Sequence, residues 1–353
     1  MRGRGMTTTP RRAALAISAV ASAALVSACS FGSGADSDGP VTLKLAHVFP
    51  EASAVHTAAT TLAERAPDVT DGRVNFDVYP GSQLGGDEEL GAGLASGDVE
   101  CAFFAATASG LDDRLQLSLL PFIATTYDGV DEVFFDEDGV IQTNERDVLA
   151  ETGITALGFY ENDFRGLTNN VRPIQTPEDM AGLSFRVPGL SMYTDLFEAW
   201  GANPVAIPFP ELYTALQQGT VDGQDNGIVL TYNSRYQEVQ KHLTLTRHAY
   251  GMGNISCNTD VWESLSEDDQ DALREVIDDI TADTTQQVRD SVADRLAELK
   301  ESGMEVVELD DAQRAAFAGI KDEVWTSQES VFGADVMEQL REESEAAAEA
   351  TSE

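Results

Sequence analysis

The sequence has few cations. Its 353 residues include 22 Lys and Arg against 61 Asp and Glu, so the formal net charge is −39. A polyphosphate chain would be repelled over most of such a surface, which excludes nucleic acid as a partner. Hydrophobic residues make up 42% of the chain, which excludes wholesale disorder. The length exceeds what one hydrophobic core usually serves, so we expect two lobes.

Metal-binding and catalytic motifs are also missing. The chain has 3 Cys and 4 His without metal-ligand spacing, and it contains no G-x-S-x-G, H-E-x-x-H or G-x-x-x-x-G-K-[ST] motif. We therefore expect no metal, no other cofactor and no enzymatic activity. Cys101 and Cys257 both lie in apolar, strand-like segments. A disulfide between them and two buried free thiols both fit the sequence.

The first 28 residues differ from the rest of the chain. They carry four Arg and no acid, and they end in an apolar run of 16 residues just before Cys29. A spanning helix needs roughly 20 residues, so residues 1–28 are predicted to be a secretory signal peptide. The ending Val-Ser-Ala-Cys also looks like a lipobox, which predicts a lipidated Cys29 that anchors the chain to the outer face of the cell membrane. The Gly/Ser/Asp-rich residues 29–40 predict a flexible tether, and residues 341–353 a frayed tail.

Strand-like and helix-like segments alternate in the part that follows. β-Branched and alternating residues predict strands at 41–48, 73–79 and 99–105. Helices are expected between them, at 53–66 and 86–96. This βαβαβ order predicts a parallel sheet with helices on its faces. Later strands are expected at 154–159, 183–187, 204–207 and 251–257, and later helices at 190–200, 210–218 and 228–239.

The longest helical pattern begins at Ser266. Ser266 and Asp269 fit a capping box, and apolar residues then recur at three- and four-residue steps until Gly303 ends the pattern. Such a helix would be about 57 Å long at 1.5 Å per residue, which is too long for one small lobe. We expect it to run along both lobes. Two helices broken near 281–285, where helix propensity is weak, are the alternative.

Three of the rare cations, Arg165, Arg172 and Arg186, fall in one short stretch. Arg186 lies inside an apolar strand, where a guanidinium is costly to bury unless an anion meets it. That anion is either an internal Asp or Glu or a ligand carboxylate, which the two parallel N–H donors of an Arg bind well. Surface charges are largely screened beyond about 8 Å, so the acidic surface does not prevent an Arg in a cleft from binding an organic acid.

Several segments, in the right order and spacing, resemble the extracytoplasmic solute-binding proteins of tripartite ATP-independent periplasmic (TRAP) transporters, above all the C4-dicarboxylate-binding family. They are YPGSQLGGDEEL, LPFIATTYDGV, FRGLTNNVRPIQTPEDMAGL, GLSFRVPG, GANPVAIPFPELYTALQQGTVDGQDN and YQEVQKHLTLTRH. The resemblance extends from Val41 to about Lys321. It implies an α/β fold of the periplasmic-binding-protein type, with two lobes, a ligand cleft between them and one long helix spanning both. We expect lobe I to comprise 41–163 and 252–290, and lobe II 164–251 and 291–340.

The resemblance also implies which residues contact the ligand. Arg186, in the G-L-x-x-R-V-P motif, is expected to pair with the ligand carboxylate, and Arg165 to be a second cation in the cleft. Asn226 of D-G-Q-x-N is expected to hydrogen-bond the ligand, and Phe209 of P-F-x-E to wall the cleft. The alternatives are purely structural roles, in which Asn226 caps the next helix and Phe209 belongs to the core. Gly227 stands where the family usually has Pro. The remaining candidates lie at the end of the first strand and after the third: His47, Phe49 and Thr107.

These residues together imply a substrate-capture protein on the extracytoplasmic side. A small organic acid docks on Arg186, the lobes close, and the closed form delivers the acid to the small and large membrane subunits of a TRAP permease. A sugar acid, in place of a dicarboxylate or keto acid, is the alternative ligand. A ligand-binding lipoprotein of a sensory system is the alternative function, because the same fold serves both.

Overall fold

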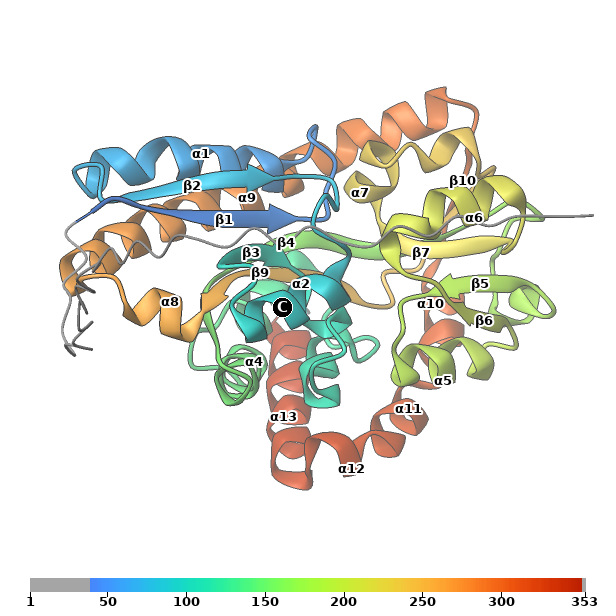
Figure 1. The fold of residues 1–353 in the computed structure, drawn as a ribbon. Coiled ribbons are helices and arrows are strands. Elements are labelled where there is room, and N and C mark those ends of the chain that lie inside the picture. Colours follow the sequence, from blue (N-terminus) through green and yellow to red (C-terminus); the bar gives the residue numbers. More distant parts are fainter. Residues whose placement is uncertain (1–38, 351–353) are drawn as a thin grey trace, which may run out of the picture. The chain divides into compact units, whose positions relative to one another are not determined.

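The computed structural model describes residues 39–350, and its ten strands form one hydrogen-bonded sheet (Figure 1). The signal peptide predicted over 1–28, the lipidated Cys29 and the tether as far as residue 38 lie outside the described residues, as do residues 351–353. Within 39–350, no helix is both long enough and apolar enough to cross a membrane.

The first part of the sheet has the strand order β2-β1-β3-β9-β4. β1 (Val41–His47) pairs in parallel with β2 (Val74–Tyr79) and with β3 (Cys101–Phe104), which confirms the predicted βαβαβ unit. β9 (Tyr250–Asn258) returns from much later in the chain and lies antiparallel between β3 and β4 (Ile154–Asn169). The sheet is therefore mixed, because a distant strand fills its middle.

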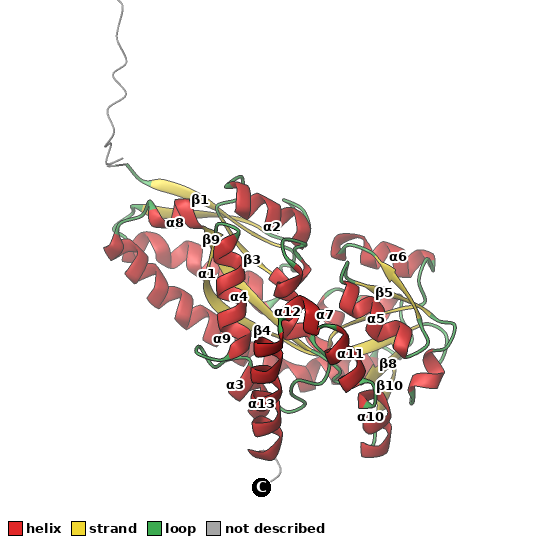
Figure 2. Cartoon of the chain, turned by 90° about the horizontal axis from the view of Figure 1, so that it is seen from below, coloured by secondary structure: helices red, strands yellow, loops and turns green. Residues whose placement is uncertain are grey.

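Helices cover this part of the sheet, and Figure 2 shows helices on both sides of the strands. α1 (Ala54–Val69) and α2 (Asp87–Ser96) connect the parallel strands, and α8 (Thr259–Glu263) leads from β9 into α9. The helices bury aliphatic side chains against the strands: Leu45, Leu62 and Ile277 belong to one core cluster and are at most 1% exposed. This burial is the main force that holds the helices on the sheet.

The long helix is continuous, as predicted. α9 (Glu267–Glu301) has 35 residues. It contacts α1 and β4, and it also contacts α7 (Ile228–Asn233). Ser266 is its N-cap, with its Oγ accepting a hydrogen bond of 3.2 Å from the backbone N–H of Asp269. Gly303 follows the helix with φ +95°, a left-handed conformation that glycine adopts without strain.

Replacing Ser266 with alanine should lower the free energy of unfolding by about 1 kcal/mol, because the N–H of Asp269 loses its acceptor at the start of α9. Chemical denaturation measures the change. Ser302→Ala is the matched control, because the Ser302 hydroxyl only donates back to the carbonyl of Leu299 in the last turn. An equal loss of stability in both variants would show that the cap contributes nothing of its own.

The second part of the sheet begins in the same strand, β4. Its residues from Ile154 to Phe164 pair with β9, and Arg165 to Asn169 pair with β7 (Gly223–Gly227). The register shifts between Glu161 and Phe164 at a bulge, where Asp163 has φ +66°. The predicted border between the lobes at 163/164 falls at this bulge; the lobe boundaries themselves stay a prediction. The other strands of this part are β5 (Ser184–Val187), β6 (Asn203–Ala206), β8 (His242–Leu245) and β10 (Glu305–Glu308), and its helices include α5 (Ser191–Ala199) and α6 (Leu212–Gln218).

The chain from residue 341 to 350 is helical, so the predicted frayed tail is wrong for these residues. They belong to α13 (Ala334–Ala350), which packs on α3 (Tyr127–Val133). Leu340, Ser344 and Ala347 recur on one buried face, and the Ser344 hydroxyl donates to the carbonyl of Ile123 at 2.6 Å. The sequence suggested fraying because alanine and serine replace larger apolar residues on that face. The remaining helices are α4 (Val140–Glu151), α10 (Asp311–Ala318), α11 (Lys321–Ser327) and α12 (Glu329–Phe332).

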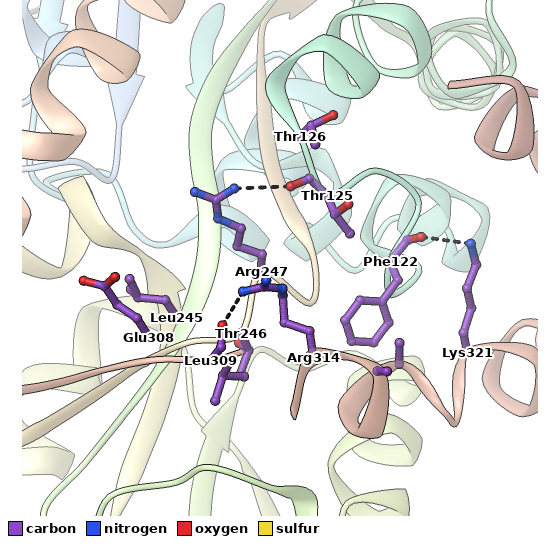
Figure 3. A pocket seen from close by; sticks show the side chains of 12 residues that line it. Phe122, Thr125, Thr126, Leu245, Thr246, Arg247, Glu308, Leu309, Arg314 and Lys321 are labelled. Carbon is purple, nitrogen blue, oxygen red and sulfur yellow. Dashed lines mark hydrogen bonds between the residues drawn. The ribbon is translucent and has the colours of Figure 1, made fainter. Parts of the chain in front are cut away.

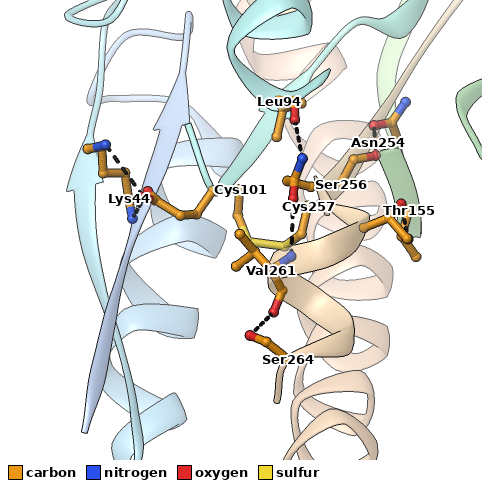
Figure 4. Close-up of a disulfide and its surroundings, with 12 residues drawn as sticks. Lys44, Leu94, Cys101, Thr155, Asn254, Ser256, Cys257, Val261 and Ser264 are labelled. Carbon is orange, nitrogen blue, oxygen red and sulfur yellow. Dashed lines mark hydrogen bonds and ion pairs between the residues drawn. A yellow bond between two sulfur atoms is a disulfide. The ribbon is translucent and has the colours of Figure 1, made fainter. Parts of the chain in front are cut away.

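Cys101 and Cys257 form a disulfide, which decides between the two alternatives left open by the sequence (Figure 4). The two residues are directly opposite each other on the antiparallel strands β3 and β9, with Cα atoms 4.0 Å apart. The bond links segments separated by 156 residues. It ties the late strand β9 to the early βαβαβ unit and implies folding in an oxidising compartment.

Candidate functional site

Six of the seven ligand-contact candidates line one cavity of about 60 Å³. Parallel strands bring most of them together, because β1 and β3 end at one side of the cavity and β5 and β7 contribute from the other part of the sheet. Ligands of open α/β sheets usually bind beyond the carboxyl ends of strands. The six residues are Phe49 after β1, Thr107 after β3, Arg165 in β4, Arg186 in β5, Phe209 after β6 and Asn226 in β7.

Arg186 is buried in this cavity without an ion pair to any of the described residues. Arg186 is 3% exposed, and its Nε donates to the carbonyl of Ile207 at 2.8 Å. Among residues 39–350 it forms no ion pair within 4.0 Å, although the chain carries 61 acids. Burial lowers the pKa of the Arg186 guanidinium. A buried cation that faces a cavity and lacks an anion is a ready binding group for a carboxylate.

Arg165 has an internal partner instead. Its Nε donates to Asp225 Oδ2 at 2.5 Å, its Nη2 donates to the Asp225 carbonyl at 2.8 Å, and its guanidinium lies over the Tyr193 ring. His248 Nε2 is 3.3 Å from the same carboxylate oxygen. Burial acts to raise the pKa of Asp225, but Arg165 and His248 outweigh it and hold that pKa well below its usual range. Asp225 therefore stays ionised and neutralises Arg165.

Asn226 points its side chain toward the cavity and does not cap the next helix. Its Nδ2 donates to Gln224 Oε1 at 2.6 Å, whereas Asp163 Oδ2 accepts from the N–H of Ile228 at 3.1 Å at the start of α7. The N-cap residue is Gly227, where the family usually has Pro. A Cβ at Gly227 would lie 2.5 Å from the carbonyl oxygen of Asn162, so only glycine fits this approach of two backbones.

Aromatic rings wall the cavity. Phe49 is 4% exposed and makes an edge contact with Tyr160, with ring centroids 6.3 Å apart. Phe209 is half-buried and packs between two core clusters, so it serves both as packing and as cavity wall. An apolar wall opposite a few polar groups is typical of a small-molecule site.

His47 does not line this cavity, which corrects its place among the candidates. It is fully buried, and its Nε2 lies 3.1 Å from His56 Nδ1. Burial, and then the proximity of His56, lower the pKa of His47 to about 4. His47 precedes Val48 and Phe49, which do line the cavity, so the prediction erred in which residues at the end of the strand face the ligand.

Asp87 is a cavity residue that the sequence analysis did not single out. It is the first residue of α2, and its Oδ1 accepts from the N–H of Ala105 at 2.9 Å. Burial raises the pKa of Asp87 to about 6, against the opposing effects of the Ala105 N–H and Arg186. An acid at the start of a helix is an ordinary feature of sequences, so only the position of Asp87 in the cavity marks it. The other lining residues that were missed include Asn162, Leu230 and Met252.

A small cavity between the strands of two parts of one sheet, with a buried Arg186 that has no ion pair within residues 39–350, is typical of a solute-binding protein. Residues 45–330 match the family described as bacterial extracellular solute-binding protein, family 7, to which the chain belongs. Together with matches to C4-dicarboxylate-binding periplasmic proteins and to TRAP solute-binding proteins, this confirms the predicted resemblance. Members of this family bind solutes for transport and are not enzymes.

Relatives and solved structures agree with this assignment. A solute-binding protein of Roseobacter denitrificans is 30% identical over 321 residues, which cover 88% of this chain and 94% of that protein. A TRAP periplasmic solute-binding protein of Sulfurospirillum deleyianum, solved with bound succinate, matches with a TM-score of 0.79 and 29% identity, covering 86% of this chain and 99% of that one. A sugar acid binding protein of Advenella mimigardefordensis, in complex with galactonate, matches with a TM-score of 0.82 and 28% identity, covering 88% and 99%. The predicted two-lobed α/β fold is confirmed.

Proposed function

We propose that this protein captures a small organic acid by pairing its carboxylate with Arg186, and that it delivers the acid to the membrane subunits of a TRAP permease. The observation that carries the proposal is the buried Arg186, which faces the cavity without an ion-pair partner among the described residues. Arg165, Asn226 and Phe209 complete the site as the second cation, a hydrogen-bonding amide and a wall. Binding of acids by solved relatives supports this ligand class.

The charges around the cavity favour an acid with one carboxylate. Asp225 neutralises Arg165, which leaves Arg186 and Asp87 as the remaining charged side chains among the described residues that line the cavity. One ligand carboxylate on Arg186 places a second negative charge near Asp87. A dicarboxylate would add a third charge in the same low-dielectric space, where repulsion is strong. We therefore favour a small monocarboxylate over a dicarboxylate.

The size of the cavity implies that binding includes a movement. At about 60 Å³ it is much smaller than the 300–1,000 Å³ or so of typical ligand pockets. A ligand therefore enters only when the cavity walls separate, and it is enclosed when they close. The permease would then recognise the closed form, which the ligand favours by its higher affinity for that state.

A thermal-shift screen of the protein against organic acids, each paired with its amide, tests this function. A ligand at 100 times its Kd should stabilise the fold by about 2.7 kcal/mol, which raises the melting temperature by several degrees. We expect a shift with at least one acid and none with its amide. Equal shifts with acid and amide, or none across a broad panel, would contradict carboxylate capture and favour the sensory alternative with another ligand.

Affinity for the acid should depend on pH through Asp87. Its pKa is raised to about 6, so Asp87 is ionised above pH 6 and repels the incoming carboxylate, whereas it is neutral at pH 5. Isothermal titration should thus show tighter binding at pH 5 than at pH 8. In Asp87→Asn this difference should be lost, with affinity at pH 8 rising about tenfold, and succinate should gain more than a monocarboxylate.

Glu88→Gln is the control for Asp87→Asn, because Glu88 is the neighbouring acid and is exposed. The same change in affinity in both variants would show that the effect comes from net charge. Weaker binding in Asp87→Asn would show that the ionised carboxylate accepts a hydrogen bond from the ligand, and the inference of repulsion would be wrong.

The proposed anchor is a lipid on Cys29, which lies outside the described residues. It rests on the Val-Ser-Ala-Cys ending of the apolar run. Radiolabelled palmitate should be incorporated into the chain in cells and should be absent from Cys29→Ser. Labelling that persists in Cys29→Ser would place the lipid elsewhere, and no labelling of the unaltered chain would contradict the anchor.

A further inference from the structure

A larger cavity, of about 630 Å³, lies outside the site around Arg186 and shares none of its lining residues. Three separate segments form it: Phe122 to Thr126, the β8–β9 connection at Leu245 to Arg247, and the stretch from Glu308 through α10 to Lys321. Figure 3 shows the side chains of Arg247 and Arg314 next to each other in this cavity, with Phe122 and Lys321 to one side.

The cavity collects three cations in a chain with a net charge of −39. Arg247 is exposed, and its only side-chain hydrogen bond within residues 39–350 goes to the Thr125 carbonyl at 3.3 Å. Lys321 Nζ donates to the Phe122 carbonyl at 2.9 Å and to Ser344 Oγ at 3.3 Å, and it has no carboxylate partner there. A guanidinium carries five N–H groups. Because Arg247 uses one of them for Thr125, most of its N–H groups remain available to a ligand.

Within residues 39–350, acids neutralise only part of the positive charge of the cavity. Arg314 pairs with Asp311, and Glu308 is the one carboxylate among the described residues that line the cavity. Its Oε1 accepts from Lys300 Nζ at 2.9 Å. Arg247 and Lys321 have no ion pair within residues 39–350. In so acidic a chain, an unpaired Arg247 next to Arg314, with Lys321 in the same cavity, is the arrangement expected of an anion site.

The backbone around the cavity is strained at two of its lining residues. Phe122 has φ +58° and Arg247 has φ +48°, a left-handed conformation that is an outlier for a bulky side chain such as Phe. A hydrogen bond of 2.8 Å from the Phe122 N–H to the His248 carbonyl fixes the two segments to each other. Strained residues held in this way cluster at binding and switch sites.

An apolar surface lies beside the cations. Phe122 and Leu309 are 7% and 4% exposed, and Ala315 and Ala318 continue this surface along α10. Cations beside an apolar wall select a ligand that has both an anionic group and an apolar body. An inorganic anion would bind the cations but would leave the apolar surface uncovered.

We propose that this cavity is a second ligand site, which binds a small organic anion with its charged group on Arg247 and Arg314 and its apolar body against Phe122 and Leu309. The ligands that fit this site have a phosphate or carboxylate group attached to a short apolar body. Thr246 and His248 flank Arg247 in the chain, and both belong to the hydrogen-bonded group that holds Arg165: Thr246 Oγ1 is 2.7 Å from His248 Nδ1, and His248 contacts Asp225. The second site therefore lies directly behind the residues that position a cation of the first cavity.

Isothermal titration of phenyl phosphate into the protein, at low ionic strength, tests the proposal. We expect one saturable site per chain, and at least tenfold weaker binding in Arg247→Gln and in Arg314→Gln. Inorganic phosphate should bind at least tenfold more weakly than phenyl phosphate. Arg235→Gln is the matched control, because it removes the same charge from an exposed Arg that pairs with Glu238, and it should bind phenyl phosphate as the unaltered chain does.

Other outcomes would overturn the proposal. Loss of phenyl phosphate binding in Arg186→Ala would place the probe in the first cavity, and an equal loss in Arg235→Gln would mean attraction by net charge alone. Absence of saturable binding would leave no second site. Binding to phosphatidylglycerol vesicles without binding of free phenyl phosphate would assign this face to the membrane. Unchanged melting temperatures of the variants show that the comparison is between folded proteins.

Discussion

Arg186→Ala should bind the organic acid roughly 30- to 4,000-fold more weakly than the unaltered protein. Removing one partner of a desolvated charge pair costs about 2–5 kcal/mol, and each 1.4 kcal/mol or so corresponds to a factor of ten in Kd. Isothermal titration with an acid from the thermal-shift screen measures the loss. The affinity of Arg186→Lys for the acid should lie between that of Arg186→Ala and that of the unaltered protein, because lysine keeps the charge but lacks the pair of parallel N–H donors.

Arg165→Ala is the control that separates binding from folding. In the unliganded protein Arg186 has no acidic partner among the described residues, so its removal should leave the melting temperature unchanged or raise it. Removal of Arg165 leaves the buried Asp225 with His248 alone, which should cost about 3–5 kcal/mol of stability. A comparable loss of stability in Arg186→Ala would mean that Arg186 serves the fold, and the proposed clamp would be wrong.

Removal of the disulfide should also lower the stability of the fold. The variant with both Cys101→Ala and Cys257→Ala should lose about 2–5 kcal/mol, because the unfolded chain is no longer constrained by a loop of this length. At 2–4 °C or so per kcal/mol, the melting temperature falls by roughly 4–20 °C, and the length of the chain favours the lower part of this range.

A reducing agent provides the matched comparison, because the reduced protein keeps both sulfur atoms in the core. Reduction should lower the melting temperature of the unaltered protein nearly to that of the double variant and should leave the double variant unchanged. If the reducing agent had no effect on the unaltered protein although free thiols appeared, the bond would contribute no stability.

Features coded by local sequence were predictable. The βαβαβ unit was visible in alternating β-branched residues, and α9 in its cap at Ser266 and its apolar spacing. The sequence could not show that β9 enters the sheet between β3 and β4, because pairing between distant strands leaves no local pattern. β7 was missed for a similar reason: Gly-Gln-Asp-Asn-Gly has the composition of a turn and is a strand only because β4 and β5 pair with it.

The sequence predicted most of the residues that line the site, but it did not predict which groups these residues contact. From spacing alone, each Arg could meet either an internal acid or a ligand. The structure contains both situations: Arg165 pairs with Asp225, whereas within residues 39–350 the Arg186 side chain donates only to the carbonyl of Ile207. The partner Asp225 is 60 residues from Arg165 in sequence, and Asp87 reaches the cavity from α2. Such distant neighbours follow from the packing of the two parts of the sheet.

The most direct test of the central claim is a crystal structure of the protein with an acid that raises its melting temperature. We expect both carboxylate oxygens within hydrogen-bonding distance of the Arg186 guanidinium, with the ligand enclosed by Phe209 and Asn226. A carboxylate that is bound elsewhere, with Arg186 still unpaired, would contradict the claim that Arg186 captures the ligand.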